Sequence, residues 1–547
     1  MGLFSLLGVA TKGMTMAQTG MDLAGQNISN ADVDGYSRKR MTLEPDYINN
    51  TPFGQSGSGV DIVNIQRMRD TFVDTEIRNQ NQEVGYYQQQ SDTLTGIQNV
   101  FTEPSDTGLQ TYMDQFFDSW QNLANNPSDL SARTTVKSDG EILADAFHNL
   151  ATQLTNQRQS TNDQISADAG QVNKLTKEIF NLNQEIASVE LSGQKANDSR
   201  DKRDKDLKDL SNLIDIDVNE DAHGQVTVTT AGNIIVSPAY QQDLETTTTT
   251  RQLADGTTIS NVGLRFADSK RDYLPQSGQI RSLFDSRDII IPQYQANLDT
   301  LATSFVKKIN TQHELGYSLN GYSGVDFFDP AVTGASDINV SASIESDVRN
   351  IAAGSGGQIR AFAEPAPYTL TFGNPPAALT NKNILYGSVQ VLAGATALTE
   401  GTDYHIDYTN GTIQLLHAGY NGTPLTINYQ YSDGSSKGPG DNANAIAIAQ
   451  LREQATMNND VLGNPTVTFG DYYSSFIGKL GLSVNEASSN VDSRTTLVQQ
   501  YQTQQDSIAG VSLDDELADI IKYQHIYAAS ARVITTASDM LDTLIKM

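Results

Sequence analysis

The sequence predicts a multidomain α+β protein made of paired terminal coiled-coil helices, a long helical bundle and nested β-rich domains. Three observations predict this fold class. Apolar residues recur at heptad spacing at both ends of the chain, and long polar stretches in the middle carry apolar residues three and four positions apart. Two further stretches alternate apolar and polar residues between turn signals. Because helical and β patterns follow one another in turn, we expect nested rather than serial domains.

Each end of the chain carries an apolar stripe whose members step by alternating three and four residues, which places them along one line of a helix. Neither helix can bury such a stripe alone, so we expect the two ends to pair as a coiled coil. Small alanines would allow close approach, and a leucine such as Leu517 is expected to fill the seam. The stripes are Leu3, Leu7, Ala10, Met14, Ala17, Met21, Ala24 and Ile28 at the start, and Leu513, Leu517, Ile520, Gln524, Tyr527, Ala531, Ile534, Ser538, Leu541 and Ile545 at the end.

A second apolar column with the same seven-residue period accompanies each stripe. At about 100° per residue these columns lie off the pairing line, so an isolated two-helix unit would leave them exposed to water. Either the protein's own core covers them, or identical subunits do, which would give a polymer built from paired terminal helices. The columns are Val9, Met16 and Leu23 in the first helix, and Ile526, Val533 and Met540 in the last.

After the first helix, we expect an extended link over Thr51–Gly59, which is rich in Gly and Ser. Helical spacing follows from about Val63 to Ala124 and from about Leu130 to Leu213. The polar residues between the apolar positions indicate solvated rods with one buried stripe, as in a long helical bundle. The charge run Asn197–Asp209 alternates in sign, which favours an exposed helix face with salt bridges over a binding patch.

Alternation on both sides of the turn Ala222–Gly224 predicts a β-hairpin, and strand character continues to about Thr250. A helix is expected at Ser277–His313. The region from Tyr368 to Tyr431 is again β, and its two Asn-Gly turns, at positions 410–411 and 421–422, each predict a hairpin.

Residues 434–440 look like a linker, and helical spacing resumes near Asn442, breaks near Pro465, and continues from Tyr472 to the end with a pause at Gly510. Ser512 and Asp515 form a start like a capping box for the last helix. The expected domains are the paired terminal helices (1–55 and 508–547), the helical bundle (56–215, 275–325 and 438–507), a β-rich domain (216–274) and a variable β-rich outer domain (326–437).

Composition excludes several functions. The chain has 36 basic and 65 acidic residues and a net charge of −29, which argues against nucleic-acid or anionic-membrane partners. It has no cysteine, so disulfides, thiolate catalysis and cysteine metal sites are excluded. The six histidines are isolated, and no phosphate-binding loop or nucleophile elbow occurs. We therefore expect no enzymatic activity, no cofactor, and no catalytic, cofactor-binding or metal-binding residue.

One segment, Gln26–Arg38, resembles the N-terminal motif of the flagellar axial proteins, the family of rod, hook and hook-associated proteins. Its Gly-Tyr-Ser-Arg ending is closer to a hook-associated member than to rod and hook proteins, which usually have Gly-Phe-Lys. The motif residues are Asn27, Asn30, Gly35, Tyr36 and Arg38. Further similar segments are 59–67, 196–198 with Arg203 and Asp204, 277–280, 310–316 with Asn320 and Gly321, Phe327 and Phe328, 440–444 and 508–516.

The resemblance implies a structural, self-assembling junction protein that polymerises as a ring between hook and filament, adapts one to the other and so serves motility. It implies partners: further copies of the chain, the hook protein, a second junction protein, the flagellar type III export apparatus and an export chaperone on the C-terminal helix. It also implies an extracellular, flagellar location reached by secretion without a cleavable signal peptide. The apolar columns would then be covered by neighbouring subunits, and the motif would shape the joint between terminal helix and outer domain.

Two alternatives stay open. The chain is another flagellar axial protein, such as hook or distal rod, or its β insertion of about 330–434, where the resemblance thins, adds an adhesive or enzymatic surface activity.

Overall fold

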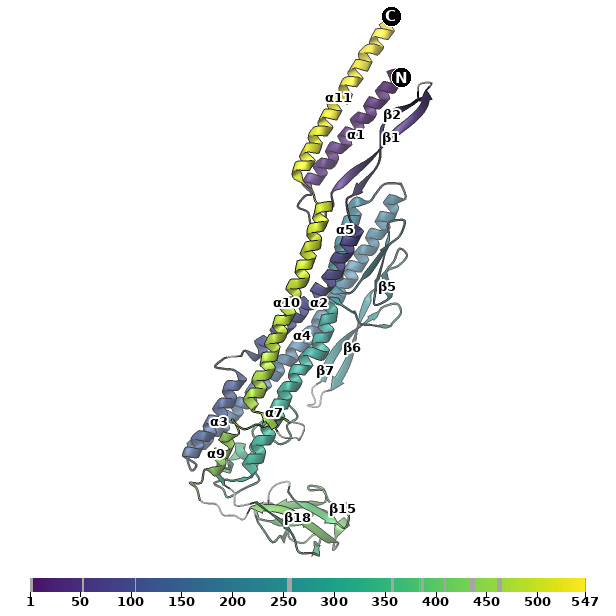
Figure 1. Ribbon diagram of the computed structural model, residues 1–547. Helices are drawn as coiled ribbons and strands as arrows, with labels where there is room; N and C mark the ends of the chain where they lie inside the picture. Colours follow the sequence, from purple (N-terminus) through teal and green to yellow (C-terminus); the bar gives the residue numbers. More distant parts are fainter. Residues whose placement is uncertain are drawn as a thin grey trace.

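The computed structural model describes residues 3–51, 54–103, 105–252, 258–355, 359–382, 384, 388–407, 410–432, 438–459 and 465–546. The molecule is elongated (Figure 1). The first and last helices stand together at one end, long helices form the middle, and a small β domain lies at the far end. Both termini therefore lie at the same end of the molecule, as the paired stripes predict.

The terminal unit consists of the first and last helices, α1 and α11, and a long antiparallel hairpin, β1–β2, beside α1 (Figure 1). The extended link predicted over Thr51–Gly59 and the helix predicted from Val63 are wrong, since the described chain is β-strand as far as Arg67, with positions 52 and 53 outside the description. β-Branched residues within 60–65 explain this, because they favour a pleated strand. The bounds are α1 (Leu3–Ser29), β1 (Lys39–Thr51), β2 (Gly54–Arg67) and α11 (Leu513–Lys546).

The helical body fills the middle of the molecule. Its longest helix, α4, has 61 residues and is therefore about 90 Å long. The single helical stretch predicted to Leu213 is broken after Glu190, where a turn with Gly193 at φ +80° lets α5 fold back along α4. The helices of the body are α2 (Thr71–Phe101), α3 (Leu109–Asn125), α4 (Leu130–Glu190), α5 (Asn197–Leu213), α6 (Gly278–Asp285), α7 (Ile291–Glu314) and α10 (Phe469–Ala509), with a π-helical turn at Ser286–Ile290 joining α6 to α7.

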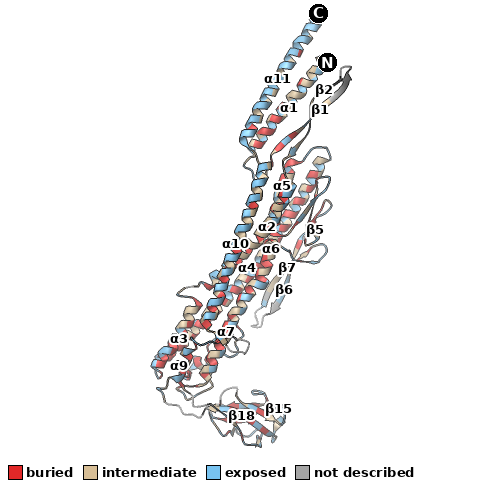
Figure 2. Cartoon of the chain, viewed as in Figure 1, coloured by how far each residue is buried: buried red, intermediate tan, exposed pale blue. Residues whose placement is uncertain are grey.

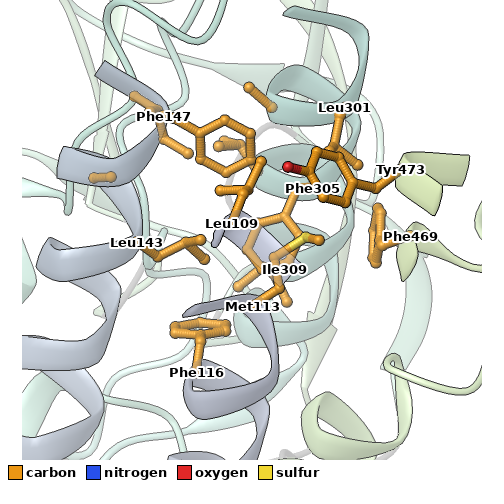
Figure 3. Close-up of a cluster of buried hydrophobic side chains, with 14 of the residues drawn as sticks. Leu109, Met113, Phe116, Leu143, Phe147, Leu301, Phe305, Ile309, Phe469 and Tyr473 are labelled. Carbon is orange, nitrogen blue, oxygen red and sulfur yellow. The ribbon is translucent and has the colours of Figure 1, made fainter. Parts of the chain in front are cut away.

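The core of the body is aromatic and closely packed. Phe116 and Phe305, from α3 and α7, are fully buried and their ring centroids lie 5.5 Å apart. Figure 3 shows these rings with Phe147 of α4 and Phe469 and Tyr473 of α10. Four helices that are distant in sequence therefore share one core, which fixes the rod on which the terminal unit stands.

Two small sheets pack on α4. The predicted hairpin is present as β3 and β4, which pair antiparallel around the expected turn. Asn183 and Asn173 of α4 each bond backbone groups of this region, which holds the sheets on the rod. The strands are β3 (Asp217–Glu220), β4 (Val226–Thr230) and β5 (Asn233–Val236) in one sheet, and β6 (Leu244–Gln252), β7 (Thr258–Phe266) and β8 (Asp272–Tyr273) in the other.

The outer β domain has a separate apolar core between two antiparallel sheets. The first Asn-Gly turn joins β16 to β17 as predicted, although Tyr408 and Thr409 lie outside the described residues. The second predicted hairpin is wrong, because β17 and β18 belong to different sheets. Asn-Gly supplies a positive φ to any tight turn, so it cannot distinguish a hairpin from a crossover. The sheets are β11 (Ile359–Ala363), β18 (Pro424–Ser432), β14 (Gln390–Ala393) and β15 (Thr396–Ala397) with β12 (Tyr368–Thr369), and β13 (Ala377–Ala378), β17 (Thr412–Leu415) and β16 (Tyr404–Asp407).

Short elements connect the body to the outer domain. Residues 327–353, which the sequence assigned to the outer domain, contribute Phe327, Ile338 and Ile351 to the aromatic core of the body. Within the described ranges, no helix has the length and apolar character needed to cross a bilayer. Most of the predicted linker 434–440 lies outside the description. The connecting elements are β9 (Gly316–Tyr317), α8 (Ala342–Ser346), β10 (Gly354–Ser355), α9 (Ala443–Gln450), β19 (Met457–Asn459), β20 (Pro465–Val467) and 3₁₀ turns at Val348–Asn350 and Ala418–Tyr420.

Candidate functional site: the terminal unit and its joint

Small residues bring α1 and α11 together. A Cβ atom on Gly13 would lie 2.8 Å from Ser530 Oγ, and one on Gly20 would lie 2.7 Å from the Tyr523 ring. Ala17 of α1 is 0% exposed. The close approach expected from the alanines is therefore present, and the two glycines, seven residues apart, deepen it.

The face of α11 that meets α1 is not the predicted one. Its line is Glu516, Tyr523, Ser530 and Ala537, again seven residues apart. Leu517, expected in the seam, is 52% exposed. Heptad spacing defines lines of residues on a helix but does not say which line meets which partner. The small residues of α1 match the line with Ser and Ala, so Leu513, Leu517 and Tyr527 of the stripe stay exposed, while Ile520, Ile534 and Leu541 at its border are half-buried.

The predicted interface residues fall into three groups. Only Leu23 is buried within the chain, and the most exposed of these residues lie on α11, which is mostly pale blue in Figure 2. Half-buried are Leu3, Leu7, Val9, Met14, Met16, Met21, Ile28, Ile520, Ile526, Ile534 and Leu541. Exposed are Leu513, Leu517, Tyr527, Val533 and Met540.

The β1–β2 hairpin lies along one flank of the helix pair. Lys12 of α1 forms ion pairs with Asp46 and Asp61 of the hairpin, at 2.5 and 2.7 Å. For the N-terminal column, the alternative that the protein covers itself is thus partly correct. An apolar opening of about 400 Å³ remains, here called the hairpin groove, lined by Leu6, Val9, Ala10, Gly13, Gly59, Val60, Ala529, Ser530 and Val533.

Arg38 bonds both connections between the terminal unit and the body. Its backbone N–H donates to Ala509 O at the end of α10 (2.8 Å), and its carbonyl accepts from Met68 N after β2 (2.9 Å). Its guanidinium Nε donates to Glu516 Oε1 of α11 at 2.6 Å. One motif residue therefore holds both connections and the first turn of α11 together.

Asn27 holds the same joint from the end of α1. Its amide bonds both the N–H and the C=O of Lys39, each at 3.1 Å, and donates to Glu516 Oε2 at 3.1 Å. Tyr36 donates its hydroxyl proton to Asn27 Oδ1 at 2.8 Å. Burial, reinforced by nearby carboxylates, raises the pKa of Tyr36 to about 12, so the hydroxyl stays a donor.

The charge run on α5 is only partly an exposed face. Asp201 accepts from Ser37 N and Oγ and from Arg67, whose guanidinium also donates to Asp204 at 2.8 Å. Burial works against the charge of Asp204, but Arg67, Arg69 and Arg203 outweigh it and hold the pKa of Asp204 below its usual range. The predicted salt bridges are present, but the predicted exposure is only partly correct: Asp198 and Lys205 are exposed, whereas Asp201 is buried against the motif loop and Arg203 is fully buried.

The other two motif residues shape the loop itself. Asn30 donates from Nδ2 to Gln26 O at 2.8 Å and so closes the last turn of α1. Gly35 has φ +85°, a conformation that residues with a Cβ rarely adopt. The loop is further tied to α5 by Asp34, which pairs with Lys205 at 2.9 Å.

Sequence reasoning missed the partners of the motif, above all Glu516, whose side chain is 3% exposed. The signal was present, because Glu516, Arg67 and Asp204 all lie in segments that resembled the axial proteins. Those segments are distant in sequence but converge on one joint. Ser512 does cap α11, accepting from Asp515 N at 3.4 Å.

Comparison with known proteins matches this architecture. A family model described as "Flagellar hook-associated protein FlgK helical domain" matches residues 94–328, and one described as "Flagellar basal body rod FlgEFG protein C-terminal" matches residues 502–547. The first spans most of the helical body with β3–β8, and the second spans the end of α10 and α11. Together they span more than half of the chain.

Full-length relatives agree with the family models. Flagellar hook-associated protein 1 of Bacillus subtilis is 26% identical over 99% of this chain and 98% of its own length. That of Escherichia coli is 25% identical over 99% of this chain and 100% of its own length. The solved flagellar hook junction protein FlgK from Burkholderia pseudomallei has the same fold, with a TM-score of 0.56 at 19% identity, over 80% of this chain and 100% of that one. Over its whole length the chain is similar to flagellar hook-associated protein 1, and its helical body matches the helical-domain model of the flagellar hook-associated proteins.

Proposed function

We propose that this chain is a structural junction protein of the bacterial flagellum that polymerises as a ring between hook and filament and adapts one to the other. The observation that carries the proposal is the heptad stripe of α11, which has the spacing of a helix interface but whose residues Leu513, Leu517 and Tyr527 remain exposed in the single chain. The names of the relatives, hook-associated and hook junction proteins, support the same role. An exposed apolar surface of this kind marks a site of protein association.

The apolar residues of both terminal helices form the polymerisation interface in this proposal. The terminal unit, which the structure extends from the expected 1–55 to Arg67 because β2 pairs with β1, forms the inner contacts; the helical body surrounds it, and the β domains face outward. The role needs no catalysis and no cofactor.

The partners in this proposal are further copies of the chain, the hook protein, a second junction protein and the type III export apparatus. An export chaperone binds α11 before assembly, since an exposed apolar helix needs cover while the chain is stored. The protein acts outside the cell and reaches that location without a cleavable signal peptide.

A deletion strain tests the role. Without the chain, hooks remain intact, filament subunits are shed into the medium and the cells do not swim, whereas the wild-type chain restores filaments. Leu517→Asp fails to restore them although the purified variant folds normally, while His525→Asp, at an exposed position of α11 outside the stripe, restores them. Loss of the hook itself would instead identify another axial protein, and filaments that persist would reject the proposal.

A further inference from the structure

The two apolar surfaces of the terminal unit lie on opposite flanks of the helix pair. At about 100° per residue, Val533 lies about 60° to one side of Ser530, which faces α1, and Leu517 lies about 140° to the other. Val533 lines the hairpin groove, whereas Leu517 does not. One flank is thus an opening beside the hairpin, and the other carries the exposed stripe residues Leu513, Leu517 and Tyr527. Further along α11, Ile534 and Leu541 lie within about 40° of Ser530 and so turn toward α1, where they are half-buried.

The stripe flank is continuous across both helices. On α1, Met14 lies about 100° from Gly13 on the side away from Val9, which lines the groove. Leu3, Leu7 and Met21 share that side. On α11, Leu513 and Leu517 are 51% and 52% exposed, and Ile521 beside them is 55% exposed. Leu7, Met14 and Met21 are half-buried, so within the described residues this flank is covered only in part, although its spacing is that of a helix that packs against another surface.

We propose that assembly is head to tail, with the heptad stripe of α11 in one copy packing into the hairpin groove of the next. This inference rests on the proposed function and assigns its contacts. A contact that used the same flank in both copies would be two-fold symmetric and would stop at a dimer. A ring instead needs two different complementary surfaces on each subunit. The terminal unit carries one such pair, an apolar groove and an apolar stripe, and both remain open when α1 and α11 are paired.

The chain has no cysteine, so single-cysteine variants report contacts without background. Val60→Cys labels the groove, and separate variants Leu513→Cys, Leu517→Cys, Tyr527→Cys, Ile534→Cys and Leu541→Cys label the stripe at successive heights. His525→Cys is the matched control on α11, exposed but outside both surfaces. Each is tagged and co-expressed with the differently tagged Val60→Cys chain in the deletion strain, and flagella are then isolated and treated with oxidant or a short bismaleimide.

We expect cross-links between the two tags at one or two neighbouring stripe positions, at least tenfold above the His525→Cys control, and none between two copies of Val60→Cys. Cross-links only between stripe cysteines of like copies would overturn the head-to-tail contact. Flagella that assemble with filaments but give no cross-link between groove and stripe with either reagent would also overturn it, and would leave the junction role standing. Failure of the wild-type chain to restore filaments would instead remove the proposed function, and this inference with it.

Discussion

In the helical body the largest side chains are the most deeply buried, whereas in the terminal unit the smallest are. Phe116, Phe305 and Trp120 are fully enclosed by their own chain, while Ala17 is enclosed and Leu517 is half exposed. Both regions use helices with the same spacing of apolar residues. This contrast shows that periodicity identifies a helix with a packing face. Only residue size and position in the fold indicate whether the surface that covers this face belongs to the same molecule.

The largest loss of stability is expected from a substitution in the aromatic core of the helical body. Phe305→Ala should lower the free energy of unfolding by about 3–5 kcal/mol, because it removes a ring that contacts Phe116, Phe328 and Phe469 and leaves a cavity. Thermal unfolding followed by circular dichroism measures it. A loss below about 1 kcal/mol would mean that the body is loosely packed and would remove the contrast with the terminal unit.

Arg38→Ala should destabilise the joint by about 2–3 kcal/mol, because it leaves the buried Glu516 carboxylate without its cation. The effect is local, so hydrogen exchange should rise in α1 and α11 and not in α4. Glu516→Gln in the same background removes the unpaired charge and should recover part of the loss. Equal exchange in wild type and Arg38→Ala would show that the joint does not depend on this pair.

Gly20→Ala should weaken the pairing of α1 with α11 by about 1–2 kcal/mol, since the new methyl group would overlap the Tyr523 ring. Gly25→Ala, in the same helix but with open space around its Cβ position, is the matched control. It should instead stabilise α1 by about 0.5–1 kcal/mol through helix propensity. Exchange rates of α1 amides distinguish the two, and similar behaviour of both variants would contradict the small-residue seam.

Acid should loosen the joint before it affects the aromatic core. The folded-state pKa of Asp204 is lowered, so its contribution is present above the unfolded value of about 4 and is lost as pH falls below it. Protection of α5 amides should therefore fall below about pH 4, and Asp204→Asn should remove this part of the pH dependence. If the pH dependence of α5 amide protection were the same in Asp204→Asn as in the wild type, the acid sensitivity would come from other carboxylates.

The smallest change in stability is expected on the exposed stripe of α11, and it separates the two regions most directly. Leu517→Ala should change the unfolding free energy of the single chain by less than about 0.5 kcal/mol, because the side chain is half exposed. If Leu517 were instead buried between α1 and α11, as the sequence predicted, the substitution would lower the unfolding free energy by about 2–5 kcal/mol. Chemical denaturation of the purified monomer separates the two values.

Much of the architecture could be predicted from periodicity, including both terminal helices, the bundle and the nested β regions. Periodicity failed where two lines of one helix were both apolar, as on α11, and where β-branched residues at 60–65 carried strand propensity inside a polar stretch. It also failed at Asp201 and Asp204, because burial of a charge depends on cations such as Arg67 that lie more than 130 positions away. The motif residues were found by resemblance, but their buried partner Glu516 required the fold.

The bond between Asn27 and Glu516 joins positions 489 residues apart in the chain. Closing so long a loop is entropically costly unless the segments between are already ordered, so this contact forms after the body has folded. The first helix can therefore reach its final position only after the last helix has been made. A chain synthesised from its N-terminus completes the α1–α11 pair only when its final residues are free, so an incomplete chain lacks the surfaces that the proposed assembly uses.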